Sequence, residues 1–259
     1  MPASATTFTH AIVRRPAASA IHGLRSVDRG APDIDALRRE HAAYIDILTR
    51  VGLTVDVLGP LEAFPDSVFV EDPALVFPEG AILLRPGAAS RLGEAAEIRS
   101  ALDDRFGRVL ALEEGFADGG DVLRTPDAVY IGLSARTDEV GATALSGLLA
   151  TLGYRAVIVR PPDGVLHLKT ACSLVDDRTL LATREIADAG LIADLDVVIV
   201  PDGEDLAANL LGINGVVLMA DGFPQTSALL AARGHEVRTL TVGEVMKLDA
   251  GLSCMSLRW

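Results

Sequence analysis

The sequence predicts an α/β fold built from five repeated units. In each unit a short strand pattern leads into a helical pattern and then into a second strand, although the helical part of the fourth unit is short and polar. The strands are continuous runs of Val, Ile and Leu, which is typical of strands that are buried on both faces. The clear helical patterns end at glycines, where a left-handed cap residue is favoured. These glycines are Gly52, Gly107, Gly153 and Gly234.

Each unit contributes its elements in the same order along the chain. First strands are expected at 10–16, 81–91, 128–137, 178–186 and 215–223. Helices are expected to follow at 35–52, 93–107, 139–153 and 225–234. Returning strands are expected at 53–59, 108–112, 154–161, 196–201 and 235–241. Further strand-like stretches at 67–77 and 167–175 make the unit ββαβ rather than βα.

Two architectures accommodate five such units. One is an open, doubly wound sheet, and the other is a closed ring of five units around a pseudo-fivefold axis. A ring removes exposed sheet edges and brings distant loops to one central mouth. The 259 residues, 49% of them hydrophobic, suffice for one large domain or two small ones, and no linker stands out. The repeat alone leaves both architectures open.

Composition limits the partners of the protein. A formal net charge of −13 argues against nucleic acid and against an anionic membrane surface, both of which need basic patches. The charge is compatible with a cationic substrate, and an acidic surface that serves solubility explains it equally well. Two cysteines form no disulfide framework, and no apolar run has membrane-spanning length. We therefore expect a soluble, cytoplasmic protein with reduced thiols.

Two acidic motifs interrupt the apolar segments. "FPDSVFVEDP" carries Asp66, Glu71 and Asp72, and strand alternation would place Glu71 and Asp72 on opposite faces. The alternative is a strand end with surface acids, or Asp72 capping a turn. "FADGGDVLR" places Asp118 and Asp121 around two glycines, which permit close backbone approach. The alternative there is a common Asp-Gly turn into the strand "VLR".

The remaining motifs contain a histidine and the two cysteines. His167 stands in an apolar stretch that is expected to be a strand, where a lone histidine is often a hydrogen-bonded core residue. Cys172 lies five positions on, on the opposite face of that strand, and we interpret it as a small buried hydrophobe. Cys254 lies among small residues in "GLSCMS" near the end of the sequence. It is either a core filler or a nucleophile.

Several chemistries lack their motifs. The chain has no CxxC, HxxxH or HExxH pattern for a metal, no GxSxG elbow and no phosphate-binding glycine loop. A cysteine, a histidine and several carboxylates remain. Carboxylates around a thiol raise its pKa, which makes little sense for a neutral or anionic electrophile. They do suit a cationic electrophile such as a guanidinium, which pairs with carboxylates in a bidentate manner.

Six motifs together carry a family resemblance. The chain closely resembles the dimethylarginine dimethylaminohydrolases of the guanidino-modifying (pentein) superfamily, from "HAIVRRP" to the last residues. The motifs occur in order as "FPDSVFVEDP", "RPGAASR", "DGGDVL", "IGLSART", "LHLKT" and "SCMSLR". The resemblance implies a five-bladed α/β propeller of ββαβ units, formed by residues 1–259 as a single catalytic domain.

The resemblance also implies the catalytic residues. Cys254 corresponds to the nucleophile and His167 to the general acid and base. Asp118 stands where many bacterial members have Glu and animal members have Asp, and its carboxylate would orient His167 and contact the guanidinium. The side chain of Asp118 is one methylene shorter than that of a glutamate at this position.

Further positions match the family's substrate-binding residues. Asp72 would bind the guanidinium with support from Glu71, and Asp66 would bind the α-amino group. Arg91 and Arg136 would bind the substrate carboxylate. The remaining matches are Phe69 against the methylene stem, Leu24 in a mobile lid, and the carbonyls of Leu248 and Ser253 at the amine end.

The implied reaction converts asymmetric dimethylarginine or monomethylarginine to L-citrulline and an amine through a covalent thiouronium on Cys254. The resemblance implies no metal or organic cofactor, and the partner is a small guanidino substrate, with a homodimer as a possible assembly. The rivals are arginine deiminase or amidinotransferase-like activity, and a non-catalytic binding protein on the same propeller, because fold alone does not fix function.

Overall fold

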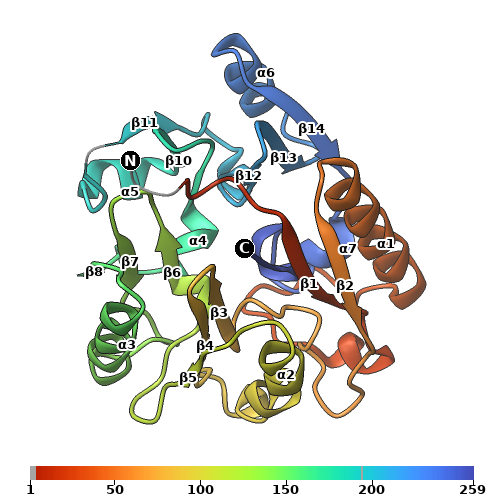
Figure 1. Ribbon diagram of the computed structural model, residues 1–259. Helices are drawn as coiled ribbons and strands as arrows, with labels where there is room; N and C mark the ends of the chain where they lie inside the picture. The colour runs from red at the N-terminus through yellow and green to blue at the C-terminus, as the bar shows by residue number, and fades with distance from the viewer. Residues whose placement is uncertain (1–3, 194) are drawn as a thin grey trace.

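Five small sheets stand around a central axis (Figure 1). The computed structural model describes residues 4–193 and 195–259, and in these residues fifteen strands form five three-stranded sheets. The sheets are separate blades, so the α/β propeller is confirmed and the open doubly wound sheet is wrong. In blade order the strands are β15 (Leu257–Arg258), β1 (His10–Arg14) and β2 (Thr54–Leu58); β3 (Ala74–Phe77), β4 (Gly80–Leu83) and β5 (Val109–Ala111); β6 (Val122–Arg124), β7 (Val129–Gly132) and β8 (Ala156–Val159); β9 (Cys172–Leu174), β10 (Thr179–Ala182) and β11 (Asp196–Ile199); β12 (Leu211–Ile213), β13 (Val216–Ala220) and β14 (Glu236–Leu240).

Every blade repeats one pairing scheme. The first strand pairs antiparallel with the middle strand, and the middle strand pairs parallel with the last. A parallel pair needs a crossover connection, and here a helix on the outside of the ring supplies it (Figure 1). These crossover helices are α1 (Ile34–Arg50), α2 (Glu94–Asp103), α3 (Glu139–Thr151), α5 (Arg184–Ala189) and α6 (Pro224–Ala232).

The two ends of the chain close the ring. β15 supplies the first strand of the blade whose other strands are β1 and β2, with Leu257 opposite Ile12. This pairing docks the segment that carries Cys254, so the segment is ordered and does not fray. The shorter helices are η1 (Ala18–His22), η2 (Ala89–Arg91), η3 (Gly119–Asp121), α4 (Leu168–Ala171), η4 (Asp205–Ala208), α7 (Gly243–Met246) and η5 (Ser253–Met255).

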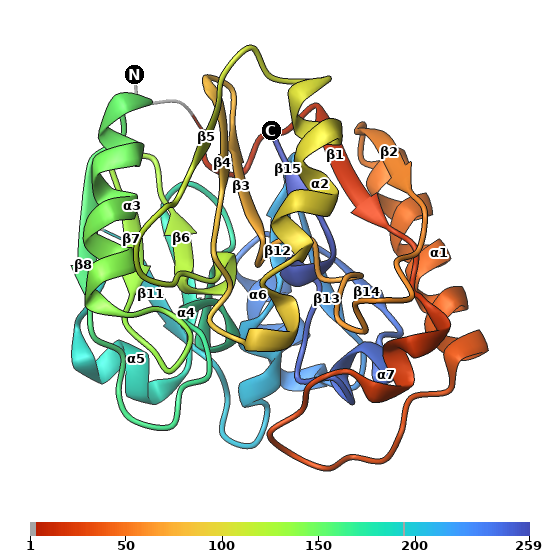
Figure 2. The ribbon, with the colours of Figure 1, turned by 90° about the horizontal axis from the view of Figure 1, so that it is seen from below.

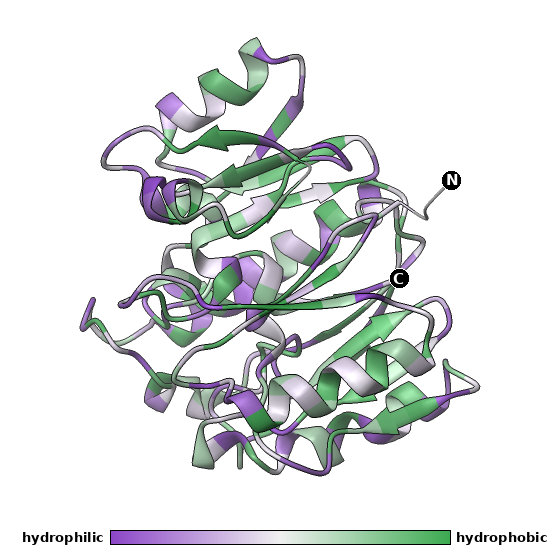
Figure 3. Cartoon of the chain, turned by 90° about the vertical axis from the view of Figure 1, so that its left-hand side faces the viewer, coloured by the Kyte–Doolittle hydropathy of each residue, from purple (hydrophilic) through white to green (hydrophobic). Residues whose placement is uncertain are grey.

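Apolar side chains fill the space between helices and sheets. Leu37, Tyr44 and Leu48 lie on one face of α1, are fully buried and pack in the same cluster as Leu218 of β13. Each such side chain contributes roughly 1.5–3 kcal/mol by leaving water. Figure 3 shows the same pattern over the molecule, with hydrophobic colour concentrated on the strands and mixed colour along the helices. No helix among the described residues has the length and apolar character that a membrane crossing requires.

Most predicted elements are confirmed, although the strands expected at 81–91 and 178–186 already end at Leu83 and Ala182, and α5 begins at Arg184. Three further details are wrong. Gly52, Gly153 and Gly234 have the expected positive φ, but Gly107 does not, and α2 ends earlier, at Asp103. An ordinary turn carries the chain onward there, with the amide of Phe106 donating to the carbonyl of Leu102.

The other two errors concern the extra strand-like stretches. Residues 67–73 form turns, in which the amide of Phe69 donates to the carbonyl of Asp66, and only β3 is a strand. His167 is not in a strand either, because it caps the single helical turn α4 that precedes β9. In both places the polar side chains lie on the turn or helical turn that precedes a strand, and not in the strand itself.

Candidate active site

One pocket near the axis gathers most of the predicted site residues. Nine of the twelve line it: Leu24, Asp66, Phe69, Asp72, Arg91, Arg136, His167, Leu248 and Cys254. Asp118 lies behind His167, whereas Glu71 and Ser253 line a different cavity. Segments far apart in the sequence therefore meet at one point of the ring.

The turn that carries Cys254 is held from several sides. The hydroxyl of Tyr44 donates to the carbonyl of Leu252 at 2.9 Å, and the amide of Glu71 donates to the carbonyl of Cys254 at 3.2 Å. Asn209 accepts from the amide of Ser253 at 3.2 Å. These bonds keep the thiol at the pocket wall, where Cys254 is 7% exposed. Cys254 therefore has pocket access that a pure core filler would lack.

The environment of Cys254 keeps the thiol protonated when the pocket holds no cation. Burial raises the pKa of Cys254 to about 12, and the carboxylates of Glu71 and Asp72 add to that increase. A thiolate is the reactive form. A cation bound beside the sulfur would lower this pKa, since it offsets both carboxylates.

His167 is fixed at the start of α4. Its Nε2 lies 3.1 Å from Oδ2 of Asp118, and the hydroxyl of Thr170 donates to the His167 carbonyl at 2.6 Å. Oδ1 of Asp121 accepts from the amide of Leu168 at 3.0 Å, which anchors the next residue. The Asp118 carboxylate therefore reaches His167 in spite of the missing methylene. The carboxylate of Asp118 also accepts from the amide of Gly87 at 2.7 Å.

Gly120 makes room for the imidazole. A Cβ built on Gly120 would lie 2.7 Å from Nδ1 of His167 and 3.0 Å from Oδ1 of Asp72. The first distance is shorter than a real Cβ contact, and the second is tighter than most, so the imidazole would have to move. The double glycine of "FADGGDVLR" is thus a point of close approach rather than an ordinary turn, although "VLR" is the strand β6 that the alternative interpretation expected.

Electrostatics favour the protonated form of His167. Burial alone would lower its pKa, but the hydrogen bond with Asp118 and the charges of Asp72 and Asp121 raise it to about 9. An imidazolium near neutral pH can donate a proton. Burial also raises the pKa of Asp121, even though the hydroxyls of Ser134 and Thr137 donate to that carboxylate.

Asp72 is the acid that faces both His167 and the pocket. Its Oδ1 accepts from the amide of Gly120 at 2.9 Å, and its Oδ2 is paired with Arg91. Burial opposes ionisation, but the charges of Arg91 and His167 hold the pKa of Asp72 below its ordinary value. Asp72 is therefore an ionised carboxylate, suited to a guanidinium.

Arg91 is bound mainly by the protein itself. Its Nε and Nη2 pair with Glu94 at 3.0 and 2.7 Å, and Nη2 also donates to the carbonyl of Phe69 at 2.9 Å. Arg91 is buried, whereas the side chain of Arg136 is 24% exposed. Arg136 is consequently the freer of the two cations that were expected to bind a carboxylate. Glu94 was missed in the sequence, although its (i, i+3) spacing from Arg91 is a signal for such a pair.

Glu71 points away from the pocket. Its Oε1 lies 2.6 Å from Nζ of Lys169 and 3.3 Å from Nη2 of Arg258, and its Oε2 accepts from the hydroxyl of Ser253 at 3.1 Å. The prediction that Glu71 and Asp72 face opposite sides is confirmed, but a turn, not a strand, separates them. The prediction that the Ser253 carbonyl lines the pocket is wrong: Ser253 lines the other cavity, and its carbonyl accepts from Arg258 at 3.1 Å.

A loop around Leu24 covers the pocket. The amide of Leu24 donates to Oδ1 of Asp66 at 2.9 Å. Further along the loop, the hydroxyl of Ser26 and Nη1 of Arg29 donate to Asp249 at 2.7 and 2.5 Å. Asp249 itself has φ of 54°, which a non-glycine residue rarely adopts. No motif in the sequence indicates these contacts between the loop and Asp249.

A metal is not needed to explain the acidic groups. Asp72, Asp118 and His167 offer ligand atoms within 4.8 Å of one another. The amides of Gly87 and Gly120 already donate to the two carboxylates, and the imidazole bonds to Asp118. A donor set of this kind also fits a planar organic cation. Catalysis without a metal stays a prediction.

The fold and the site together define a class. A five-bladed α/β propeller with a cysteine, a histidine and carboxylates in one axial pocket is the arrangement of the guanidino-modifying pentein class. The comparisons with known proteins give the family.

No model of a known protein family matches the chain. The chain is 39% identical to N(G),N(G)-dimethylarginine dimethylaminohydrolase of Pseudomonas aeruginosa over 97% of this chain and 100% of that protein. It is 36% identical to the enzyme of that name from Streptomyces coelicolor, over 96% of each. A solved structure of the Pseudomonas aeruginosa enzyme, a cysteine-to-serine variant in complex with citrulline, has a TM-score of 0.94 at 38% identity and covers 98% of this chain and all of its own. The chain belongs to the dimethylarginine dimethylaminohydrolase family.

Proposed function

We propose that the protein hydrolyses asymmetric dimethylarginine and monomethylarginine to L-citrulline and dimethylamine or methylamine. The observation that carries the proposal is the meeting of Cys254, His167 and Asp72 in one pocket, with Asp118 on the imidazole. The Pseudomonas aeruginosa relative, which shares the family and the fold, has been solved with citrulline bound. Residues 1–259 would act as a single catalytic domain.

The substrate enters with its guanidinium toward Asp72. The α-amino group would pair with Asp66 and with the carbonyl of Leu248, and the α-carboxylate with Arg136. The methylene stem would pack on Phe69 under the Leu24 loop. Burial raises the pKa of Asp66, although the charge of Arg91 opposes this, so an incoming ammonium would favour its ionised form.

The bound guanidinium places a positive charge beside Cys254 and thereby lowers the pKa of its thiol, which releases its proton to the solvent because His167 is already protonated. The thiolate attacks the central guanidinium carbon, and the carbon–nitrogen bond to the methylated nitrogen breaks. The His167 imidazolium gives its proton to the departing amine. This leaves a covalent thiouronium on the sulfur and a neutral imidazole.

Water completes the reaction. Neutral His167 takes a proton from a water molecule, whose oxygen attacks the thiouronium carbon. The carbon–sulfur bond then breaks, which returns the thiolate, and the second proton of the water leaves the oxygen for the solvent, so that the neutral urea group of citrulline remains. Asp118 holds the imidazole in place during both proton transfers, and Gly120 keeps the space for it open.

The test is citrulline release from asymmetric dimethylarginine, monomethylarginine and arginine. We expect turnover of the methylated substrates, little turnover of arginine, and none by Cys254→Ser. Cys172→Ala is the matched control, because Cys172 is buried in β9 away from the pocket. Preference for arginine would replace this proposal with a deiminase activity. Absence of turnover in a folded protein would favour a non-catalytic binding protein.

Assembly and location are separate proposals. A homodimer and a cytoplasmic location stay predictions, and sedimentation velocity together with cell fractionation would check them. Binding of the small-molecule substrate depends neither on a dimer nor on the location, because all the proposed contacts come from one chain.

A further inference from the structure

A second cavity lies on the propeller axis behind the active site. Its lining includes residues near both chain ends, such as Thr6, Phe8 and Arg258, whereas the Leu24 loop borders the active-site pocket. Figure 2 shows the chain ends at one end of the axis and this loop at the opposite end. The cavity measures about 120 Å³ and the active-site pocket about 60 Å³. For comparison, an engineered cavity of about 150 Å³ holds benzene.

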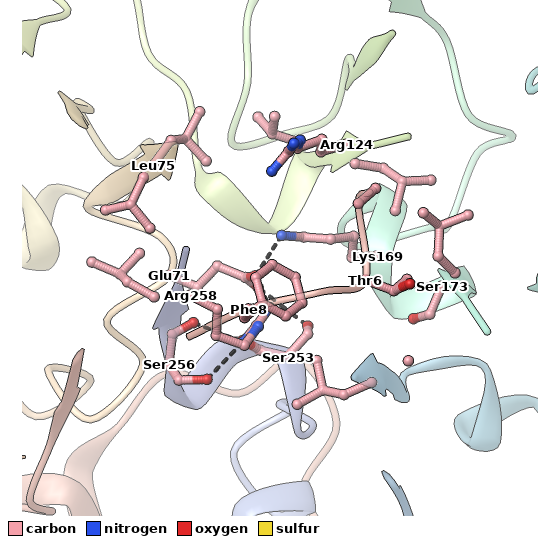
Figure 4. Close-up of a pocket in the computed structure, with 18 of the residues that line it drawn as sticks. Thr6, Phe8, Glu71, Leu75, Arg124, Lys169, Ser173, Ser253, Ser256 and Arg258 are labelled. Atoms are coloured by element: carbon pink, nitrogen blue, oxygen red, sulfur yellow. Dashed lines mark hydrogen bonds and ion pairs between the residues drawn. The ribbon is translucent and has the colours of Figure 1, made fainter. Parts of the chain in front are cut away.

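The cavity is positively charged. Arg124 of β6, Lys169 of α4 and Arg258 of β15 converge on it from three elements (Figure 4). Among the residues that the structure describes, Glu71 is the only acidic side chain in its lining. Lys169 and Arg258 both contact Glu71, whereas Arg124 has no ion pair with it, so two cations share one carboxylate and a third stands apart from it. This local excess of cations contrasts with the formal charge of −13 that the protein carries as a whole.

Two of these cations keep unused donors. Nε of Arg124 and Nε of Arg258 are buried and have no hydrogen-bond partner within residues 4–193 and 195–259. Nη2 of Arg124 donates to the carbonyl of Ser4 at 3.2 Å, and its guanidinium lies over the rings of Phe77 and Tyr154. A buried donor without a partner costs about 1–3 kcal/mol. Both Nε atoms are covered by protein, so each side chain must turn before its Nε meets an acceptor in the cavity.

The rest of the wall is apolar. It includes Leu75, Val122, Leu174 and Leu211. A strongly hydrated inorganic anion would leave this surface uncovered, whereas a hydrocarbon would cover it. The geometry points to one ligand class: we propose that this cavity binds a small monocarboxylate with a hydrocarbon tail, its carboxylate among Arg124, Lys169 and Arg258.

The cavity shares a wall with the candidate nucleophile. Arg258 donates to the carbonyl of Ser253, and the Ser253 hydroxyl lies between Oε2 of Glu71 at 3.1 Å and Sγ of Cys254 at 3.9 Å. An anion bound behind this wall adds a negative charge near the sulfur and opposes formation of the thiolate. The monocarboxylate ligand of the second cavity therefore acts as an inhibitor that binds outside the substrate pocket.

This inference does not rest on the proposed substrate, because binding and thiol reactivity are measured without turnover. The probe is 4-fluorobenzoate, followed by fluorine NMR on the full chain, with 4-fluorobenzamide as the uncharged control. Arg136→Ala removes the carboxylate partner in the active site. Arg124→Met and Arg124→Gln remove the cation from the second cavity, and Arg160→Met removes an exposed arginine elsewhere.

We expect the benzoate, but not the amide, to bind to the parent, to Arg136→Ala and to Arg160→Met. Affinity should fall about tenfold or more in both Arg124 variants, since a charged hydrogen bond is lost. Saturating benzoate should slow alkylation of Cys254 by iodoacetamide in Arg136→Ala on the order of threefold to tenfold. Retention of binding in both Arg124 variants, its loss in Arg136→Ala, or no binding at all would each overturn the proposal.

Discussion

Replacing Asp118 by asparagine isolates the charge that controls His167. The two side chains have nearly the same volume, and the amide oxygen of the asparagine could still accept a hydrogen bond from Nε2. The pKa of His167 is about 9 against an ordinary value of 6.5, although burial alone would lower it. That difference corresponds to about 3 kcal/mol in favour of the imidazolium.

The Asp118→Asn variant should lower the pKa of His167 by about one to two units, because Asp72 and Asp121 remain. At pH 8 the protonated fraction would fall from about nine-tenths to about one-quarter for a drop of about 1.5 units. We expect kcat to fall about 10²- to 10⁴-fold, since both proton transfers pass through this imidazole.

The pKa is measured by titrating the histidine ring nitrogens by NMR, with His167→Asn to assign the signal. Stability gives a second readout. A raised pKa stabilises the folded state below the ordinary pKa of 6.5, and this contribution is lost as the pH rises through about 9. The free energy of unfolding in urea should therefore differ more between parent and variant at pH 6 than at pH 9.5. An unchanged titration midpoint in Asp118→Asn would refute the assignment of the raised pKa to this hydrogen bond.

Four other outcomes are expected. Gly120→Ala should reduce kcat at least about 100-fold with a smaller loss of stability, because its Cβ displaces the His167 ring; kinetics beside thermal melting check this. Asp249→Ala should raise KM more than it lowers kcat, because the Leu24 loop loses its hydrogen bonds to Asp249; steady-state kinetics separate the two effects. Tyr44→Phe should lower the free energy of unfolding by about 1–2 kcal/mol in urea, because the buried carbonyl of Leu252 loses its donor. Dialysis against EDTA should leave citrulline release unchanged, and a loss restored by a divalent cation would contradict the metal-free mechanism.

The repeated units were predictable because burial leaves a periodic record in the sequence. Each middle strand is covered on both faces, so its residues are continuously apolar, and each crossover helix alternates core and solvent positions. The strand patterns at 10–16, 81–91, 128–137, 178–186 and 215–223 correspond to β1, β4, β7, β10 and β13. The short segments near the axis were harder to predict. His167 and Asp72 lie on turns next to strands, and in the sequence the polar residues of such turns are not distinguishable from the end of a strand.

The site could be predicted only in part. Cys254, His167 and Asp118 were recognisable from motifs that match a family, and the structure places them together. The Lys169–Glu71–Arg258 cluster joins three segments that are distant in sequence, and none of these residues stands in a motif that indicates its partner. Glu71 points away from the active-site pocket because residues 67–73 form turns, whereas the sequence predicted a strand there.

The sequence by itself determined the α/β class, the five units and the residue types available for chemistry, because propensity and periodicity are local properties. Only the tertiary structure decided that the ring closes through β15, that Glu71 pairs with Lys169 and Arg258, and that a second, cationic cavity lies behind Cys254. These features depend on contacts between residues up to about the whole chain length apart, as in the pairing of Ile12 with Leu257. Such contacts are selected by the packing of the complete molecule, and a local pattern carries no information about which distant partner a side chain will meet.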